Sequence, residues 1–197
     1  MILKVLLAPR EFYRHFPRSR NQTQIVILLI LAGIARAFDR AIGKSQGDSW
    51  ELGTIIVFSI LIGGLLGWIS FYVYAALVSW TSTWVGGRIT GKATLEIMAY
   101  AAIPMIFSLV FLSLQMMIYG SRIFRSDDSF AEYDLNFFVY NGLFAIHALL
   151  SLYSFALFVI GLSEVQKISV GKAALNALSP IVFFLAIAAI VLVGTMI

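Results

Sequence analysis

The sequence predicts an all-α membrane protein with five transmembrane helices, its N-terminus in the cytoplasm and its C-terminus outside. Composition, long apolar stretches and the placement of charges predict this fold class. Of 197 residues, 60% are hydrophobic and 12% are charged, and the mean hydropathy is +0.92. Soluble domains carry about 25% charged residues. The composition therefore excludes a soluble enzyme and indicates that lipid surrounds most of the chain.

Five stretches have the length that a membrane span requires. A helix needs roughly 20 apolar residues to cross about 30 Å of hydrocarbon at ~1.5 Å per residue. The predicted spans are Thr23–Ala41, Leu52–Val85, Thr94–Tyr119, Leu135–Leu162 and Ala173–Ile197. This divides the chain into a cytoplasmic amphipathic segment, residues 1–22, and a five-helix transmembrane domain, residues 23–197.

The charges between the spans predict the orientation. With the N-terminus inside, nine of the 14 basic residues lie in cytoplasmic segments, which then carry a net charge of +6 against −2 outside. Cytoplasmic loops of membrane proteins are enriched in lysine and arginine. Membrane topology thus accounts for the basic character of the chain, and nucleic acid is not an expected partner.

The N-terminal segment is predicted to be an amphipathic helix that begins near Pro9. Phe12, Tyr13 and Phe16 share one face, and Arg10 and Arg14 share another. Such a segment lies on the membrane surface, with its arginines near anionic headgroups. It then acts as a topology anchor; the alternative is a helix that recruits a partner.

A degenerate repeat connects the two halves of the membrane domain. The motif Gly-Lys-Ala-x-Leu occurs at residues 91–95 and again at 171–175, and each following span contains a proline, Pro104 or Pro180. Both motifs follow an inward-running span, so the sequence predicts two parallel helical-hairpin repeats. Each proline frees a helical carbonyl group and is expected to kink its span.

Four other residues are predicted to have structural roles inside the bundle. Gly63 and Gly67, with Gly64 beside them, form a small-residue face that permits close helix packing. Arg36 lies within the first span, where an unpaired charge is costly. Asp39, one helical turn away, is a candidate partner for it, as are acidic residues of the outer loop.

Several short motifs resemble the Yip (Ypt/Rab-interacting protein) family. They are Pro9 with Phe12, Gly-Gly-Arg-x-x-Gly-Lys at 86–92, Tyr-Ala-Ala-Ile-Pro at 100–104, and Glu-Val-Gln-Lys-Ile-Ser at 164–169. The resemblance implies five spans and a cytoplasmic N-terminus. Eukaryotic members have a long cytosolic N-terminal region and are associated with Rab GTPases. The short segment here favours a prokaryotic-type member in the plasma (inner) membrane; a eukaryotic chain would lie in an endomembrane.

No catalytic or metal-binding pattern stands out in the sequence. The chain has no cysteine and two histidines, and the spans contain neither paired aspartates nor a nucleophile with a base. We expect no enzyme activity and no cofactor. His147 in the fourth span is interpreted as a hydrogen-bonded packing residue.

The predicted function is therefore binding. We expect an adaptor or bilayer-organising protein that meets a membrane or cytoplasmic protein partner through its two cytoplasmic turns; a homo-oligomer is compatible with the sequence. The alternative is a small transporter or channel with its path between the repeats. The candidate binding residues are the charged residues of the turns: Arg88, Lys92, Glu96, Glu164, Lys167 and Lys172.

The topology can be tested with single cysteines, because the chain has none of its own. Cysteine at Lys44 or Asp128 is expected to react with an impermeant thiol reagent added outside, whereas cysteine at Lys92 or Lys167 is expected to react only after the membrane is opened. Labelling of Lys92→Cys from outside would contradict the orientation.

Overall fold

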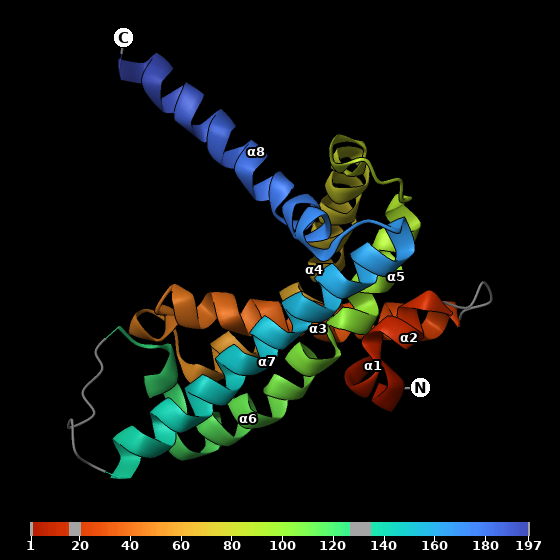
Figure 1. Ribbon diagram of the computed structural model, residues 1–197. Helices are drawn as coiled ribbons and strands as arrows, with labels where there is room; N and C mark the ends of the chain where they lie inside the picture. Colours follow the sequence, from red (N-terminus) through yellow and green to blue (C-terminus); the bar gives the residue numbers. More distant parts are fainter. Residues whose placement is uncertain (1, 16–20, 127–134, 197) are drawn as a thin grey trace. The chain divides into compact units, whose positions relative to one another are not determined.

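The computed structural model describes residues 2–15, 21–126 and 135–196 (Figure 1). These residues form helices joined by turns and contain no strand, so the predicted all-α class is confirmed. Phe16 and Asp128 lie outside the described residues. In chain order the elements are α1 (Ile2–Leu7), α2 (Pro9–Arg14), α3 (Gln22–Gly43), η1 (Gln46–Asp48), α4 (Leu52–Thr81), η2 (Ser82–Val85), α5 (Gly91–Ala101), α6 (Ile103–Tyr119), η3 (Gly120–Phe124), α7 (Leu135–Gln166) and α8 (Val170–Met196).

Within the described residues, three helical segments are long and apolar enough to cross a membrane. They are Leu52–Val85, Gly91–Phe124 and Phe138–Gln166; the segment Val170–Leu185 is apolar but shorter. Large apolar side chains on these helices are exposed, including Leu65 and Leu149, each 65% accessible. Lipid is the solvent that such surfaces fit. The first and fifth spans and the orientation stay predictions.

The chain divides into two compact units, and α4 and α7 each contribute to both. Unit 1 comprises Met1–Arg18, Phe71–Met98 and Leu157–Ile197, and unit 2 comprises Ser19–Ser70 and Ala99–Ala156. Unit 1 therefore holds α1, α2, most of α5, α8 and the C-terminal parts of α4 and α7. Unit 2 holds α3, α6 and the N-terminal parts of α4 and α7.

Glycines bring α3 and α4 into backbone contact in unit 2. A Cβ atom added to Gly63 would lie 2.7 Å from Cα of Ile34 and 2.8 Å from the carbonyl oxygen of Gly33. One added to Gly67 would lie 2.6 Å from Cα of Gly33. Real Cβ atoms do not approach backbone this closely, so these positions depend on the missing side chain. The sequence identified Gly63 and Gly67 but not their partner, Gly33.

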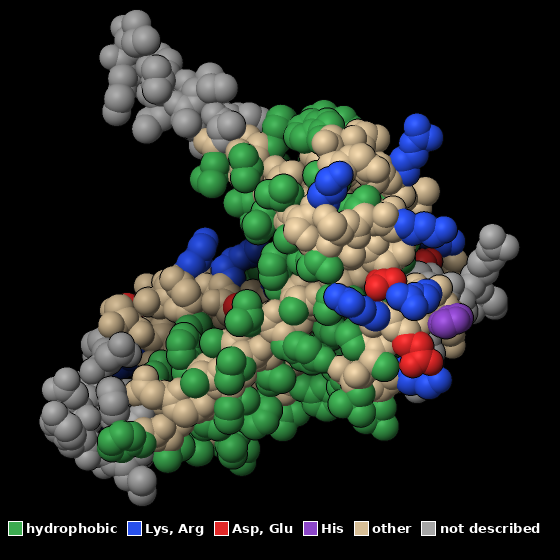
Figure 2. Space-filling model, viewed as in Figure 1, with side chains coloured by type: hydrophobic (Ala, Val, Ile, Leu, Met, Phe, Trp, Pro, Cys, Tyr) green, Lys and Arg blue, Asp and Glu red, His purple; other side chains and the backbone are tan. Residues whose placement is uncertain are grey.

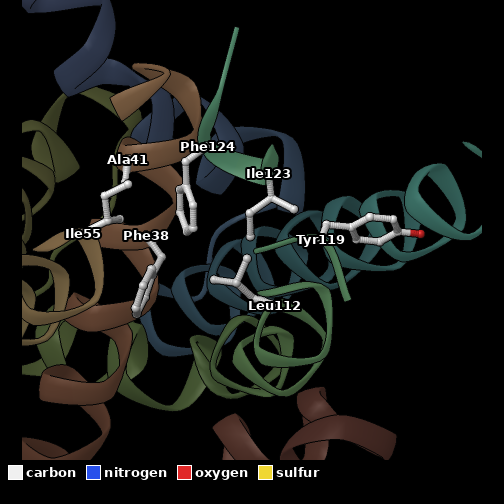
Figure 3. Packing of buried hydrophobic residues seen from close by; sticks show 7 residues of the cluster. All are labelled: Phe38, Ala41, Ile55, Leu112, Tyr119, Ile123 and Phe124. Carbon is white, nitrogen blue, oxygen red and sulfur yellow. The ribbon is translucent and has the colours of Figure 1, made fainter. Parts of the chain in front are cut away.

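Aromatic and aliphatic side chains of α3, α4, α6 and η3 form the core of unit 2. Figure 3 shows Phe38, Leu112, Ile123 and Phe124 packed together, and Tyr119 extends from the edge of the cluster. The ring of Tyr119 meets that of Tyr140 on α7 edge-on, with centroids 5.7 Å apart. These contacts join α7 to the cluster.

Hydrogen bonds tie the α3–α4 connection to the segment after η3. Both Oγ and the backbone N–H of Ser126 donate to the carboxylate of Asp48, at 2.6 and 3.1 Å. Nε of Arg125 donates to the carbonyl oxygen of Gly47 at 3.4 Å. The Ser126 hydrogen bonds hold the pKa of Asp48 below its ordinary value of 3.8.

The third predicted span is divided at its proline. α5 ends at Ala101 and α6 begins at Ile103, so Pro104 lies in the first turn of α6, where its missing N–H costs no hydrogen bond. The N–H of Met105 donates to Oγ of Ser154 on α7 at 2.9 Å. A side chain of a neighbouring helix thus satisfies a backbone donor at the interruption.

The glycine contact gives a matched mutational test within α4. Gly63→Ala and Gly67→Ala are expected to destabilise the protein by at least about 2 kcal/mol, because the added methyl group meets backbone atoms. Gly64→Ala is the control: its Cβ would lie 3.8 Å or more from any neighbour, and alanine improves helix propensity by up to ~1 kcal/mol. Unfolding in mixed detergent measures the differences. Equal effects at all three positions would contradict the contact.

Candidate functional site

The two cytoplasmic turns of the predicted topology lead into helices with matching N-caps. Oγ1 of Thr90 accepts from the N–H of Ala93 at the start of α5, at 3.3 Å. Oγ of Ser169 accepts from the N–H of Lys172 at the start of α8, at 3.4 Å. Hydroxyl side chains satisfy backbone donors that a helix start leaves unpaired.

A serine of the preceding helix fixes each turn. Oγ of Ser79 on α4 donates to the carbonyl oxygen of Ile89, and Oγ of Ser163 on α7 donates to that of Ile168, each at 2.7 Å. Both acceptors directly precede the capping residue. The shared pattern is therefore basic residue, isoleucine, hydroxyl residue. Aligning the two Gly-Lys-Ala motifs does not reveal this shared pattern. In the second turn, Val170 lies between the capping residue and the glycine, so the two turns are out of register by one residue.

The two turns contact each other at Gly87 and Gln166. A side chain at Gly87 would collide with the Gln166 amide. Gln166 is 8% exposed, and its amide atoms are buried without a hydrogen-bond partner in the described part of the chain. Gly86 adopts φ +78° and Lys167 φ +56°, so both turns reverse direction through left-handed backbone. Gly87 thus permits the turns to approach closely.

The six charged residues predicted as a binding surface all lie on these turns or at the adjoining helix ends in unit 1. Arg88, Lys92, Lys167 and Lys172 are exposed, whereas Glu96 and Glu164 are half-buried. The carboxylate of Glu164 lies 3.5 Å from Nε of Arg14 on α2, a partner that sequence reasoning missed. Figure 2 shows lysine and arginine side chains gathered with acidic ones around α2 and α5.

The aromatic face of the N-terminal segment packs on protein. Tyr13 is 1% exposed and Phe12 9% exposed. The hydroxyl of Tyr13 donates to the carbonyl oxygen of Ile97 on α5 at 3.5 Å, and a Cβ at Gly161 on α7 would lie 3.0 Å from the tyrosine ring. The sequence predicted a segment on the membrane surface and named no protein contact for Phe12 or Tyr13. The structure instead shows this face seated between α5 and α7, because Gly161 leaves space for the ring.

A buried polar cluster joins the end of α4 to α8 around Pro180. Proline has no N–H for the carbonyl of Asn176, four residues earlier, and Oγ of Ser179 lies 2.7 Å from that oxygen as a replacement donor. Oγ1 of Thr81 lies 2.9 Å from Oδ1 of Asn176 and 2.7 Å from Oγ of Ser179. The hydroxyl of Tyr74 donates to the carbonyl of Ala177. α8 continues through Pro180 as one helix.

Unit 2 contains a second polar contact, between α3 and α7. Nε2 of His147 lies 2.9 Å from Oδ1 of Asp39, with their side chains 16% and 33% exposed. Arg36 is exposed on α3. The sequence considered Asp39 only as a partner for Arg36 and missed its contact with His147. Among the residues that the structure describes, no group of three or more His, Cys, Asp or Glu side chains is arranged to hold a metal ion.

The comparison with protein families agrees with the motifs of the turns. The family model described as the Yip1 domain matches residues 3–192. The chain belongs to the Yip1 family. Curated proteins and solved structures give no match. The Yip1 match covers the N-terminal helices, both turns and the polar cluster, so these features all lie within the family domain.

The packing of Tyr13 against α5 and α7 in this Yip1 domain can be tested by a substitution at Gly161. Gly161→Ala is expected to displace the N-terminal segment, because the methyl group meets the Tyr13 ring and Ile97. Trypsin cleavage at Arg10 and Arg14 should then accelerate about tenfold, as for a loss of ~1.4 kcal/mol in local stability. Gly142→Ala on the same helix is the control, since a Cβ there has no neighbour within 4 Å. An unchanged cleavage rate in Gly161→Ala would contradict the packing of Tyr13 against Gly161.

Proposed function

We propose that this Yip1-family membrane protein is a non-enzymatic adaptor or bilayer-organising protein whose cytoplasmic turns bind a protein partner. The observation that carries the proposal is the contact between the two turns at Gly87 and Gln166. Two segments about 80 residues apart are built with the same hydrogen-bond pattern and meet in one unit. A paired surface of this kind is suited to recognition.

Binding explains the charged residues of the two turns better than stability does. The four basic side chains are exposed, and exposed ion pairs contribute only about 0–1 kcal/mol to stability. Glu164 is held at ion-pair distance from Arg14, so the N-terminal segment takes part in the same surface. A membrane topology signal requires only the basic residues. The acidic residues therefore fit a role in shaping the surface for a partner.

The proposal includes the orientation and the location. The N-terminus lies inside and the C-terminus outside, as the charge distribution favours. The turns then face the cytoplasm, and the protein lies in a plasma membrane as a prokaryotic-type member of the family. The two parallel hairpins are related through the matching N-caps of α5 and α8.

A second candidate function is transport along a path between the hairpins. The observation that favours it is Asn176, which is fully buried with an amide nitrogen that has no hydrogen-bond partner in the described residues. A polar solute would satisfy such a group. Purified protein in liposomes discriminates the two candidates, because solute flux or conductance supports a path and binding without flux supports the adaptor.

The adaptor proposal is tested by photo-crosslinking from the turns in native membranes. A crosslinking residue is placed at Val170 in the wild-type chain and in the double variant Glu96→Gln, Glu164→Gln. Partner recovery is expected to fall about tenfold in the variant, equivalent to ~1.4 kcal/mol of binding free energy. Glu51→Gln, which removes an exposed acidic residue before α4, is the control. Equal recovery from variants that insert normally would reject the proposal.

A further inference from the structure

The strongest unassigned feature is the contact between Asp39 on α3 and His147 on α7, both in unit 2. Nε2 of His147 and Oδ1 of Asp39 are 2.9 Å apart. That oxygen accepts no well-aligned hydrogen bond from the described residues, so the contact is electrostatic more than directional. An ionisable pair between helices of a membrane protein is expensive to insert and commonly marks a functional site.

The position of His147 along its helix places the pair within the hydrocarbon layer. The apolar part of α7, Phe138–Gln166, has 29 residues and is therefore about 43 Å long. A hydrocarbon layer of ~30 Å centred on it leaves about 7 Å at each end. His147 lies nine residues beyond Phe138, at ~13 Å. The imidazole is thus below the interface, on the side away from the cytoplasmic turns.

The other ionisable side chains on the helices of unit 2 do not titrate in the same pH range. They are Arg36 and Arg40 on α3, Tyr100 on α5, Tyr119 on α6, and Tyr140 and Tyr153 on α7; η1 adds Asp48, η3 adds Arg122, Arg125 follows η3, and residues 52–70 of α4 have none. The pKa of Asp48 is held below its ordinary value, so this carboxyl stays charged above pH 5. Arginine stays charged and tyrosine stays neutral between pH 5 and 8. A response of these helices in that range therefore originates in the histidine and its carboxylate partner.

The geometry defines where the proton binds. Nε2 faces a carboxylate oxygen, so a hydrogen on Nε2 is favoured in both charge states and Nδ1 is the atom that takes up the proton. Uptake converts a neutral ring facing a carboxylate into an imidazolium–carboxylate ion pair. Away from water this attraction is strong, so α3 and α7 are held together in the protonated state and released when the proton leaves.

We propose that Asp39 and His147 form a proton-binding site in the membrane-spanning part of the chain, which controls the contact between α3 and α7. The site responds to acidification on the side opposite the cytoplasmic turns. It acts separately from partner binding at those turns, and neither proposal depends on the other. Its ligand is the proton.

The chain allows a direct test, because it contains only two histidines. In a His15→Gln background, His147 is the single imidazole, and its titration is followed by NMR in lipid nanodiscs. Spin labels at Lys44→Cys and Leu149→Cys, both exposed positions, report the distance between α3 and α7 by electron–electron resonance from pH 5 to 8.5. Asp39→Asn and His147→Gln are the matched variants, because each keeps the shape and a hydrogen-bonding group.

The distance between the two spin labels is expected to change with pH. The midpoint of this change should coincide with the midpoint of the His147 titration. Asp39→Asn and His147→Gln should each abolish the distance change while retaining helical circular dichroism. A distance independent of pH in the wild-type chain, or a distance change that survives in Asp39→Asn or in His147→Gln, would overturn the proposal.

Discussion

Lipid cannot donate or accept hydrogen bonds, and most of this structure follows from that constraint. Every backbone polar group in a membrane-spanning segment must find its partner within the protein. Ser154 accepts from the N–H of Met105 where α5 gives way to α6. Oγ of Ser179 lies against the carbonyl that Pro180 leaves without an N–H. Helix association in lipid also lacks a hydrophobic driving force, so the backbone contact at Gly33 and Gly63 has a structural role that an apolar side chain cannot fill.

Local composition and spacing predicted much of the fold. The apolar stretches gave the positions of α3, α4, α7 and α8 to within a few residues, because exclusion of charge from hydrocarbon acts on each residue separately. Pro104 predicted a kink in the third span for an equally local reason. Motifs from both turns identified the Yip family, which the match over residues 3–192 confirms. The spans of α3 and α8, the orientation and the hairpin repeat depend on more than local composition and stay predictions.

Contacts between segments that lie far apart in the sequence could not be predicted from local composition and spacing. The protein contact of Tyr13 was not predicted, because an amphipathic spacing is the same whether the apolar face meets lipid or protein. The deciding residue, Gly161, lies almost 150 positions away and carries no signal by itself. Glu164 was predicted as a binding residue with no named partner, yet it lies beside Arg14. His147 looked isolated because Asp39 is on another helix. In each case chain folding, not residue type, supplies the partner.

The polar groups of the two units differ in what they contribute physically. Thr81, Ser179 and Asn176 are neutral. Ser179 lies against the carbonyl that Pro180 leaves without an N–H, and Thr81 contacts the side chains of Ser179 and Asn176. The contact between Asp39 and His147 joins two side chains and does not replace a backbone hydrogen bond. An ion pair in a low-dielectric environment is often no more stabilising than apolar residues of the same volume, because desolvation offsets the attraction. Apolar side chains would join α3 to α7 without titrating. What the pair adds is dependence on the proton, and this distinguishes a responsive contact from a structural one.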